Sequence, residues 1–150
     1  MVTAGATQAV RLALRAVCKP GDVVAIERPA YFGTLLLLED LGLKALEIST
    51  DPHYGMVPDA MAAALAKHKP KAVLASPTVQ NPLGACMPVE HKRALVALLE
   101  QAGVPLIEDD VYGDLAGESL RPPACKAFDS SGNVLYCSSV SKTLAPGWRI

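Results

Sequence analysis

The chain contains 150 residues, of which 51% are hydrophobic and 19% are charged. This composition supports one buried core and excludes a disordered or low-complexity segment. Its 14 basic and 15 acidic residues give a net charge of −1, and no cluster of lysines and arginines is present. We therefore expect no nucleic-acid contact within these residues and no polybasic membrane anchor.

The leucine run at residues 35–38 is followed at once by Glu39 and Asp40. It is far too short to span a bilayer, and the first eight residues lack the features of a signal peptide, so we expect no membrane contact. The four cysteines are widely spaced and form no C-x-x-C pair, which predicts reduced thiols and a cytoplasmic location. The three histidines have no metal-ligand spacing to one another or to the cysteines, so no metal site is expected.

Short apolar runs alternate with longer segments of helical periodicity along the chain. The pattern predicts helix 6–17, strand 23–26, helix 32–41, strand 45–48, helix 58–68, strand 72–75, helix 89–102, strand 105–107 and strand 134–137. The helix over 89–102 has the clearest pattern, because Leu95, Leu98 and Leu99 recur at helical spacing and Gly103 supplies the stop.

Strands and helices in this order predict parallel pairing through right-handed crossovers, and therefore an α/β fold. The strands are apolar at nearly every residue, as expected when helices cover both faces of the sheet. We therefore expect a three-layer sandwich with a mostly parallel central sheet. Residues 113–133, which contain several glycines and prolines, are predicted to form a long excursion between two strands. Because the chain begins almost directly with a helix and ends at residues that resemble a further strand, we expect residues 1–150 to be an incomplete domain whose N-terminal and C-terminal parts are absent.

Polar residues gather in the four segments that follow predicted strands, at residues 27–31, 76–84, 108–112 and 138–142. In parallel α/β sheets the carboxyl ends of the strands meet at one edge, where ligands bind. We therefore expect these segments to form one site.

Lys142 is compatible with three kinds of enzyme site. Ser141, Lys142 and Thr143 resemble the end of a phosphate-binding loop, but the glycines that such a loop needs are absent. Ser139 and Lys142 match the Ser-x-x-Lys of serine acyl-enzymes, but the companion motifs of those enzymes are absent. The third kind is a Schiff-base lysine for pyridoxal phosphate, and the rest of the sequence favours it.

Pyridoxal chemistry needs an amine, a carboxylate for the pyridine nitrogen, donors to the ring oxygen, a stacking ring and a phosphate site. Lys142 supplies the amine. Asp109 or Asp110 supplies the carboxylate, and since successive strand residues point to opposite faces, only one of the two can face the ring. The ring-oxygen donors, the stacking ring and the phosphate site also have candidates. A helix start, a hydroxyl group and a cation could bind the phosphate. These residues are Tyr112 and Asn81 for the ring oxygen, Tyr31 for stacking, and Gly5, Ala6, Thr7, Ser139 and Arg149 for the phosphate.

Five segments in order carry a family resemblance: TAGATQ at 3–8, PAY at 29–31, NPLG at 81–84, DDVY at 109–112 and SVSKTLAPGWR at 139–149. With them the chain resembles the class I/II aminotransferases, which are fold-type I pyridoxal-phosphate enzymes. The signature is closest to that of the aminotransferase-like domain of MocR/GntR-type transcriptional regulators. The resemblance implies that the chain is a fragment of the large, pyridoxal-phosphate-binding domain of that fold.

The resemblance also implies roles for single residues. Lys142 corresponds to the lysine that forms the Schiff base and later moves a proton. Asp109 corresponds to the aspartate at the pyridine nitrogen, because Tyr112 follows it in the family's Asp-x-x-Tyr spacing. Lys142, Asp109 and Tyr112 are thus the expected catalytic residues. The other expected cofactor-binding residues are Gly5, Ala6, Thr7, Tyr31, Asn81, Ser139 and Arg149.

Two functions are implied. The first is a pyridoxal-phosphate-dependent aminotransferase that transfers an amino group between an amino acid and a 2-keto acid. The alternative is the ligand-sensing effector domain of a MocR/GntR-type regulator, which would bind an amino compound and act on a DNA-binding domain elsewhere in the parent chain. A homodimer is implied in both cases.

Overall fold

The structure is a computed structural model, and it describes residues 1–117 and 121–148. Within these residues a six-stranded sheet has the order β3-β2-β1-β4-β5-β6. The strands are β1 (Val23–Arg28), β2 (Lys44–Asp51), β3 (Gly55–Met56), β4 (Ala72–Ala75), β5 (Leu106–Asp109) and β6 (Val134–Cys137). The helices are α1 (Ala6–Val17), α2 (Phe32–Asp40), α3 (Pro58–His68) and α4 (Val89–Ala102), and the short 3-10 helices are η1 (Gly113–Leu115), η2 (Cys125–Phe128), η3 (Val140–Lys142) and η4 (Pro146–Trp148).

The sheet is mostly parallel, as predicted. β1 pairs in parallel with both β2 and β4, and the parallel pairing continues through β5 to β6. The chain first builds outward from β1 to β2 and then crosses back to place β4 on the other side of β1. The strand order therefore reverses between β1 and β4, which is where an open α/β sheet forms its ligand crevice.

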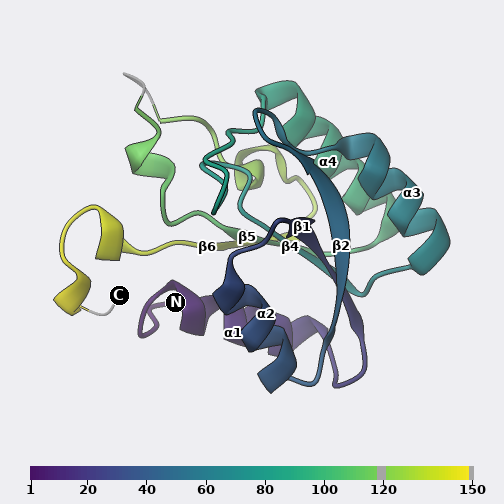
Figure 1. Cartoon of the computed structure of the whole chain (residues 1–150), viewed down its shortest axis with the longest axis horizontal. Coiled ribbons are helices and arrows are strands. Elements are labelled where there is room, and N and C mark those ends of the chain that lie inside the picture. Colours follow the sequence, from purple (N-terminus) through teal and green to yellow (C-terminus); the bar gives the residue numbers. More distant parts are fainter. Residues whose placement is uncertain (118–120, 149–150) are drawn as a thin grey trace.

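Helices cover both faces of the sheet and complete the three predicted layers. Figure 1 shows α1 and α2 on one side of the strands and α3 and α4 on the other. Alternate residues of one strand enter the two cores: Leu106 packs with α3 and α4, whereas Ile107 packs with α1 and α2. This alternation places Asp109 on the α1–α2 face, and Glu108 and Asp110 on the opposite face.

Two features of the strands differ from the prediction. The two-residue strand β3, which pairs antiparallel with β2, is too short to leave a periodic pattern in the sequence. β2 was expected to be covered on both faces, but four of its eight residues are exposed. β2 lies next to the sheet edge, so the covering helices protect it less than they protect β1, β4 and β5. None of the helices in the described ranges is long and apolar enough to cross a membrane.

The core makes a prediction about stability. Leu99 on α4 is fully buried, whereas Leu36 on α2 is 58% exposed. Leu99→Ala should lower the free energy of unfolding by about 2–5 kcal/mol, because it leaves a cavity in the packed core. The matched control Leu36→Ala should change it by less than about 0.5 kcal/mol. Urea denaturation followed by circular dichroism measures both, and equal losses in the two variants would contradict this packing.

Candidate functional site

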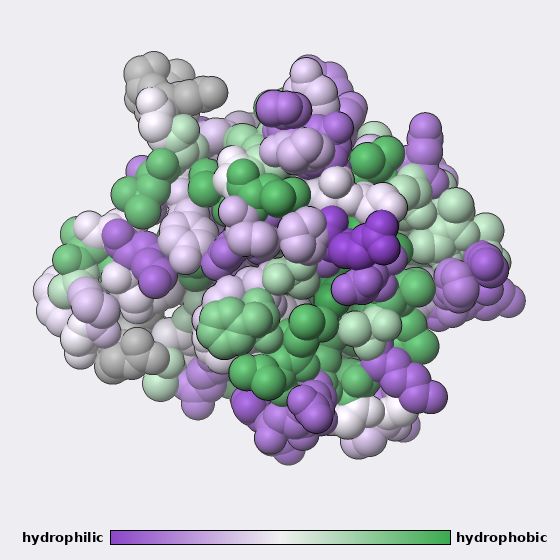
Figure 2. All heavy atoms as spheres, in the orientation of Figure 1, coloured by the Kyte–Doolittle hydropathy of each residue, from purple (hydrophilic) through white to green (hydrophobic). Residues whose placement is uncertain are grey.

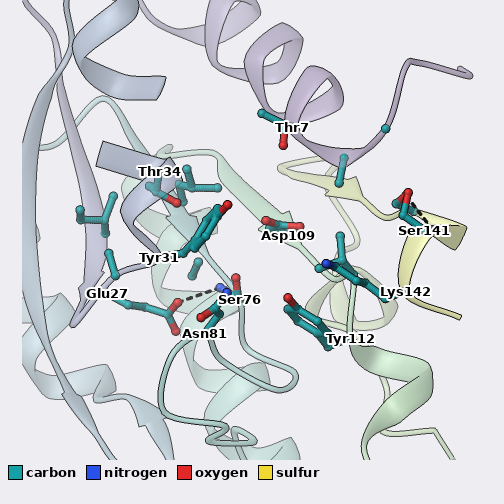
Figure 3. Close-up of a pocket in the computed structure, with 18 residues that line it drawn as sticks. Thr7, Glu27, Tyr31, Thr34, Ser76, Asn81, Asp109, Tyr112, Ser141 and Lys142 are labelled. Carbon is teal, nitrogen blue, oxygen red and sulfur yellow. Dashed lines mark hydrogen bonds between the residues drawn. The ribbon is translucent and has the colours of Figure 1, made fainter. Parts of the chain in front are cut away.

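A cavity of about 320 Å³ opens at the carboxyl edge of the sheet, beside the point where the strand order reverses. Its walls come from the start of α1 and from the segments that follow β1, β4, β5 and β6, as Figure 3 shows. Five parts of the chain that are distant in sequence thus meet around one space. A concave site lined by converging polar groups is the usual form of a small-molecule site.

Nine of the ten predicted site residues line this cavity. They are Gly5, Ala6, Thr7, Tyr31, Asn81, Asp109, Tyr112, Ser139 and Lys142. The tenth, Arg149, lies outside the described residues. The structure therefore brings together every predicted site residue that it describes.

Asp109 ends β5 and directs its carboxylate into the cavity (Figure 3). Its Oδ1 atom is buried and has no hydrogen-bond partner among the described residues. Burial, together with a smaller effect of the charge of neighbouring Asp110, raises the pKa of Asp109 to about 6. A buried carboxylate without a partner is costly. The cavity therefore fits a ligand that brings a positive charge or an N–H donor to Asp109.

Lys142 lies at the end of η3, and Figure 3 shows its side chain directed into the same cavity as that of Asp109. The Nζ atom lies 5.8 Å from the centroid of the Tyr112 ring. Ser139 shapes the turn that carries Lys142, because its Oγ accepts a hydrogen bond from the backbone N–H of Ser141 at 3.1 Å. The site thus pairs an amine that can attack a carbonyl group with a carboxylate that needs a partner.

The start of α1 forms one end of the cavity and is suited to an anion. Gly5 occupies the N-cap with φ 90°, a conformation that favours glycine, and no side chain caps the helix. The first amide groups of a helix have no intrahelical acceptor, and they lie at the positive end of the helix dipole. Ala6 and Thr7 stand at this position on the cavity wall. The arrangement is one that binds phosphate.

Tyr31 is held by its neighbour Gly33. A Cβ atom at position 33 would lie 2.4 Å from Cε1 of Tyr31, so the ring occupies space that only glycine leaves free. Tyr31 is 43% exposed and presents its ring at the cavity wall. It is therefore placed to stack on a planar ligand.

The loop that carries Asn81 is tied to the loop that carries Tyr31. Gln80 is buried, and its Nε2 donates to the backbone oxygen of Pro29 at 2.8 Å. Its Oε1 accepts from the backbone N–H of Leu83 at 2.9 Å. The first bond joins the two loops, and the second lies within the loop that carries Asn81.

Glu27 is a cavity residue that the sequence reasoning did not select. It ends the buried part of β1, and its Oε2 accepts a hydrogen bond from the backbone N–H of Ser76 at 2.9 Å. The pKa of Glu27 is raised to about 7, chiefly by burial and further by the charge of Asp109, while the hydrogen bond from Ser76 acts in the opposite direction. An acidic residue directly after a buried strand was the available signal. Thr34, Ser76 and Ser141 also line the cavity and were not selected.

The two raised pKa values predict how stability depends on pH in the ligand-free chain. The pKa of Asp109 rises from 3.8 to about 6 on folding, and that of Glu27 from 4.5 to about 7. Between these values the two carboxyl groups are ionised in the unfolded chain but still protonated in the folded chain. The free energy of unfolding therefore falls as pH rises from about 4 to about 7. Urea denaturation at a series of pH values measures this decrease.

Asp109→Asn and Glu27→Gln should each make the decrease shallower, because each removes one buried ionising group. Asp59→Asn is the matched control, because Asp59 is exposed on the first turn of α3, and this variant should keep the full decrease. A free energy of unfolding that rises over this pH range in the unsubstituted chain would contradict the burial of these carboxyl groups.

Comparisons with known proteins give a consistent result. The family model for aminotransferase class I and II matches residues 1–150. The chain is 44% identical over its whole length to the uncharacterized HTH-type transcriptional regulator YjiR of Escherichia coli (strain K12), of which it covers 32%. It is also 35% identical over 157 aligned residues, again along its whole length, to aromatic-amino-acid aminotransferase 1 of Thermococcus litoralis, of which it covers 37%.

Among solved structures, the kynurenine aminotransferase of Pyrococcus horikoshii superposes with a TM-score of 0.92 at 33% identity. That structure is a complex with PMP, substrates and products, and the match covers 99% of this chain and 38% of that one. The chain spans about a third of the length of the curated relatives described above.

Proposed function

The chain belongs to the aminotransferase class I and II family, and from that premise we propose that it binds pyridoxal 5′-phosphate and transfers an amino group between an amino acid and a 2-keto acid. The observation that carries the proposal is the pairing of the Lys142 amine with the unpartnered buried carboxylate of Asp109 in one cavity. Residues 1–150 would then be part of the cofactor-binding large domain of a longer protein.

The residues present fit the parts of the cofactor. The Lys142 amine would hold its aldehyde, and the Asp109 carboxylate would accept the N–H of its pyridine ring. Tyr112 and Asn81 would donate to the ring oxygen, and Tyr31 would stack on the ring. The phosphate would lie against the start of α1, with Gly5, Ala6, Thr7 and Ser139 around it. Arg149 remains a proposed phosphate contact from the sequence.

Each side chain then has a task that its chemistry allows. When bound, pyridoxal phosphate supplies an electron sink for the bond that is broken at the substrate carbon. Nζ of Lys142 would take the proton from that carbon and return it later. A ring N–H cation beside Asp109 favours the ionised carboxylate, which burial alone disfavours. The Tyr112 ring, which lies close to Nζ, limits where the amine can move.

A second function has its own support. The relative at 44% identity is named as a transcriptional regulator, and its similarity extends over the whole chain. In this alternative the same cavity holds pyridoxal phosphate and an amino-compound effector, and the site acts as a sensor for a DNA-binding domain in the parent chain.

A homodimer is part of the proposal in both cases. Phe32, Leu35 and Leu36 on α2 are exposed next to Tyr31, and Figure 2 shows hydrophobic atoms gathered over this helix. An apolar face of this kind is typical of an interaction surface.

The cofactor bond is tested by trapping it. Borohydride added in the presence of pyridoxal phosphate should leave a stable label on Lys142, which peptide mass mapping identifies. Lys142→Ala should abolish that label, because no other amine in the described residues lines the cavity. Lys67→Ala, at an exposed position on α3, should leave the label unchanged. A label distributed over surface lysines would refute the proposed role of Lys142.

Turnover separates the two functions. A full-length parent protein that is an aminotransferase should release many equivalents of keto acid per site when it is given an amino acid and an acceptor keto acid. A sensor should release at most about one equivalent, because the half-reaction is not repeated. Keto acid measured against the number of labelled Lys142 residues decides between the two.

A further inference from the structure

A buried carboxylate lies directly behind the cavity, on the other face of the sheet. Asp110 follows β5, is 1% exposed and does not line the cavity. Its Oδ2 accepts a hydrogen bond from Nη2 of Arg121 at 2.6 Å and another from the hydroxyl of Tyr136 at 3.0 Å. Arg121 also donates to that hydroxyl at 2.9 Å. The three side chains therefore form a closed set of hydrogen bonds.

The backbone of Asp110 is also bonded to the end of β6. Its N–H donates to the backbone oxygen of Cys137 at 2.8 Å, and its carbonyl oxygen accepts from the hydroxyl of Ser138 at 2.8 Å. Tyr136 and Cys137 belong to β6, and Ser138 follows it. Asp110 is thus bonded to the end of β6 by its side chain and by both of its backbone polar groups.

The turn that contains Gly113 lies against the ion pair of Asp110 and Arg121. A Cβ atom at Gly113 would lie 2.4 Å from Oδ1 of Asp110 and 2.5 Å from Nη2 of Arg121. A side chain at position 113 would therefore collide with the ion pair, so the pair lies directly against this turn. Because charge-assisted hydrogen bonds are the strong ones, a buried carboxylate with an arginine partner makes a firm anchor.

The position of the anchor in the sequence indicates what it holds. Asp109 precedes Asp110 and Tyr112 lies two residues after it, so one side of the junction carries the carboxylate of the cavity. Ser139 and Lys142 follow Ser138, so the other side carries the amine. The carboxylate and the amine of the cavity therefore come from the two segments that Asp110 joins.

We propose that Asp110, held by Arg121 and Tyr136, is a positioning residue that fixes the Lys142 amine relative to the Asp109 carboxylate. The inference rests on the proposed function, because it concerns the placement of the two groups that would hold the cofactor at its aldehyde and at its ring nitrogen. Asp110 acts through the backbone of its neighbours and touches neither ligand nor cavity.

Two ligands separate positioning from general stability. Pyridoxal 5′-phosphate engages both Lys142 and Asp109, whereas pyridoxine 5′-phosphate has the same ring and phosphate but lacks the aldehyde that binds the amine. Misplacing Lys142 relative to Asp109 should therefore weaken binding of the first ligand much more than binding of the second. The ratio of the two dissociation constants is the readout, measured by absorbance and fluorescence titration.

Arg121→Met and Asp110→Ala should each reduce the preference for the aldehyde by roughly tenfold or more, the size of effect expected when reacting groups lose their alignment. Tyr136→Phe removes hydrogen bonds but keeps the ion pair, and it should give a smaller reduction in the same direction. This variant supplies the test if the other two do not fold, which circular dichroism establishes. Asp114→Asn is the matched control, because Asp114 is exposed and contacts Nε of Arg121 at 2.6 Å without contacting Asp110 or β6 in the described hydrogen bonds. It should leave the ratio unchanged.

Folded variants that keep the ratio of the original chain, or that lose affinity for both ligands by the same factor, would overturn the positioning role while leaving the proposed function intact. If the proposed function itself fails, the original chain shows no preference for the aldehyde and no borohydride label on Lys142. That result refutes the positioning role as well.

Discussion

The structure buries one carboxylate oxygen of Asp109 at the end of a central strand and leaves it without a hydrogen-bond partner among the described residues. Folding normally avoids such a group, because an isolated charge loses its hydration without gaining a hydrogen bond in exchange. The sheet tolerates it because the neighbouring strands are well packed and because the cavity beside it can admit a cation. A buried polar group that lowers the stability of the fold is typical of functional sites. The other features of the site are arranged around this carboxylate.

Much of the fold could be predicted from the sequence. The helices at 6–17, 58–68 and 89–102 have the predicted bounds, because an amphipathic pattern, a proline start and a glycine stop act within a single segment. The short strand β3 and the exposure of β2 could not be predicted in this way. They depend on where a strand lies in the sheet, and neither periodicity nor composition carries that information.

Some residues of the candidate site could likewise be predicted from the sequence, and others could not. Lys142, Asp109, Tyr112 and Asn81 could be selected because the carboxyl ends of parallel strands share an edge and because their motifs occur in a fixed order. Glu27 directly follows an apolar run, but this signal alone does not distinguish a buried acid from a solvated one at the end of a strand. The bonds from Asp110 to Arg121 and Tyr136 join positions 11 and 26 residues away. Such contacts become visible only when the loops are placed in space.

The cavity explains why the chain can be similar both to an aminotransferase and to a regulator. A cavity that captures an aldehyde through an amine and a ring through a carboxylate can serve turnover or detection. Which of the two occurs depends on what else surrounds the bound molecule. In the proposed function, residues 1–150 would contribute the amine of Lys142 and the carboxylate of Asp109 to this capture.

The contact between Tyr31 and Gly33 has a consequence for how this protein can diverge. The ring lies where a side chain at position 33 would have to stand, so a larger residue at 33 would require the ring to move. A lineage that exchanges the aromatic residue for a smaller one frees position 33 to vary, and a lineage that first adds bulk at 33 displaces the ring. Among descendants of this sequence, loss of the glycine should therefore accompany or follow loss of the tyrosine and should not precede it.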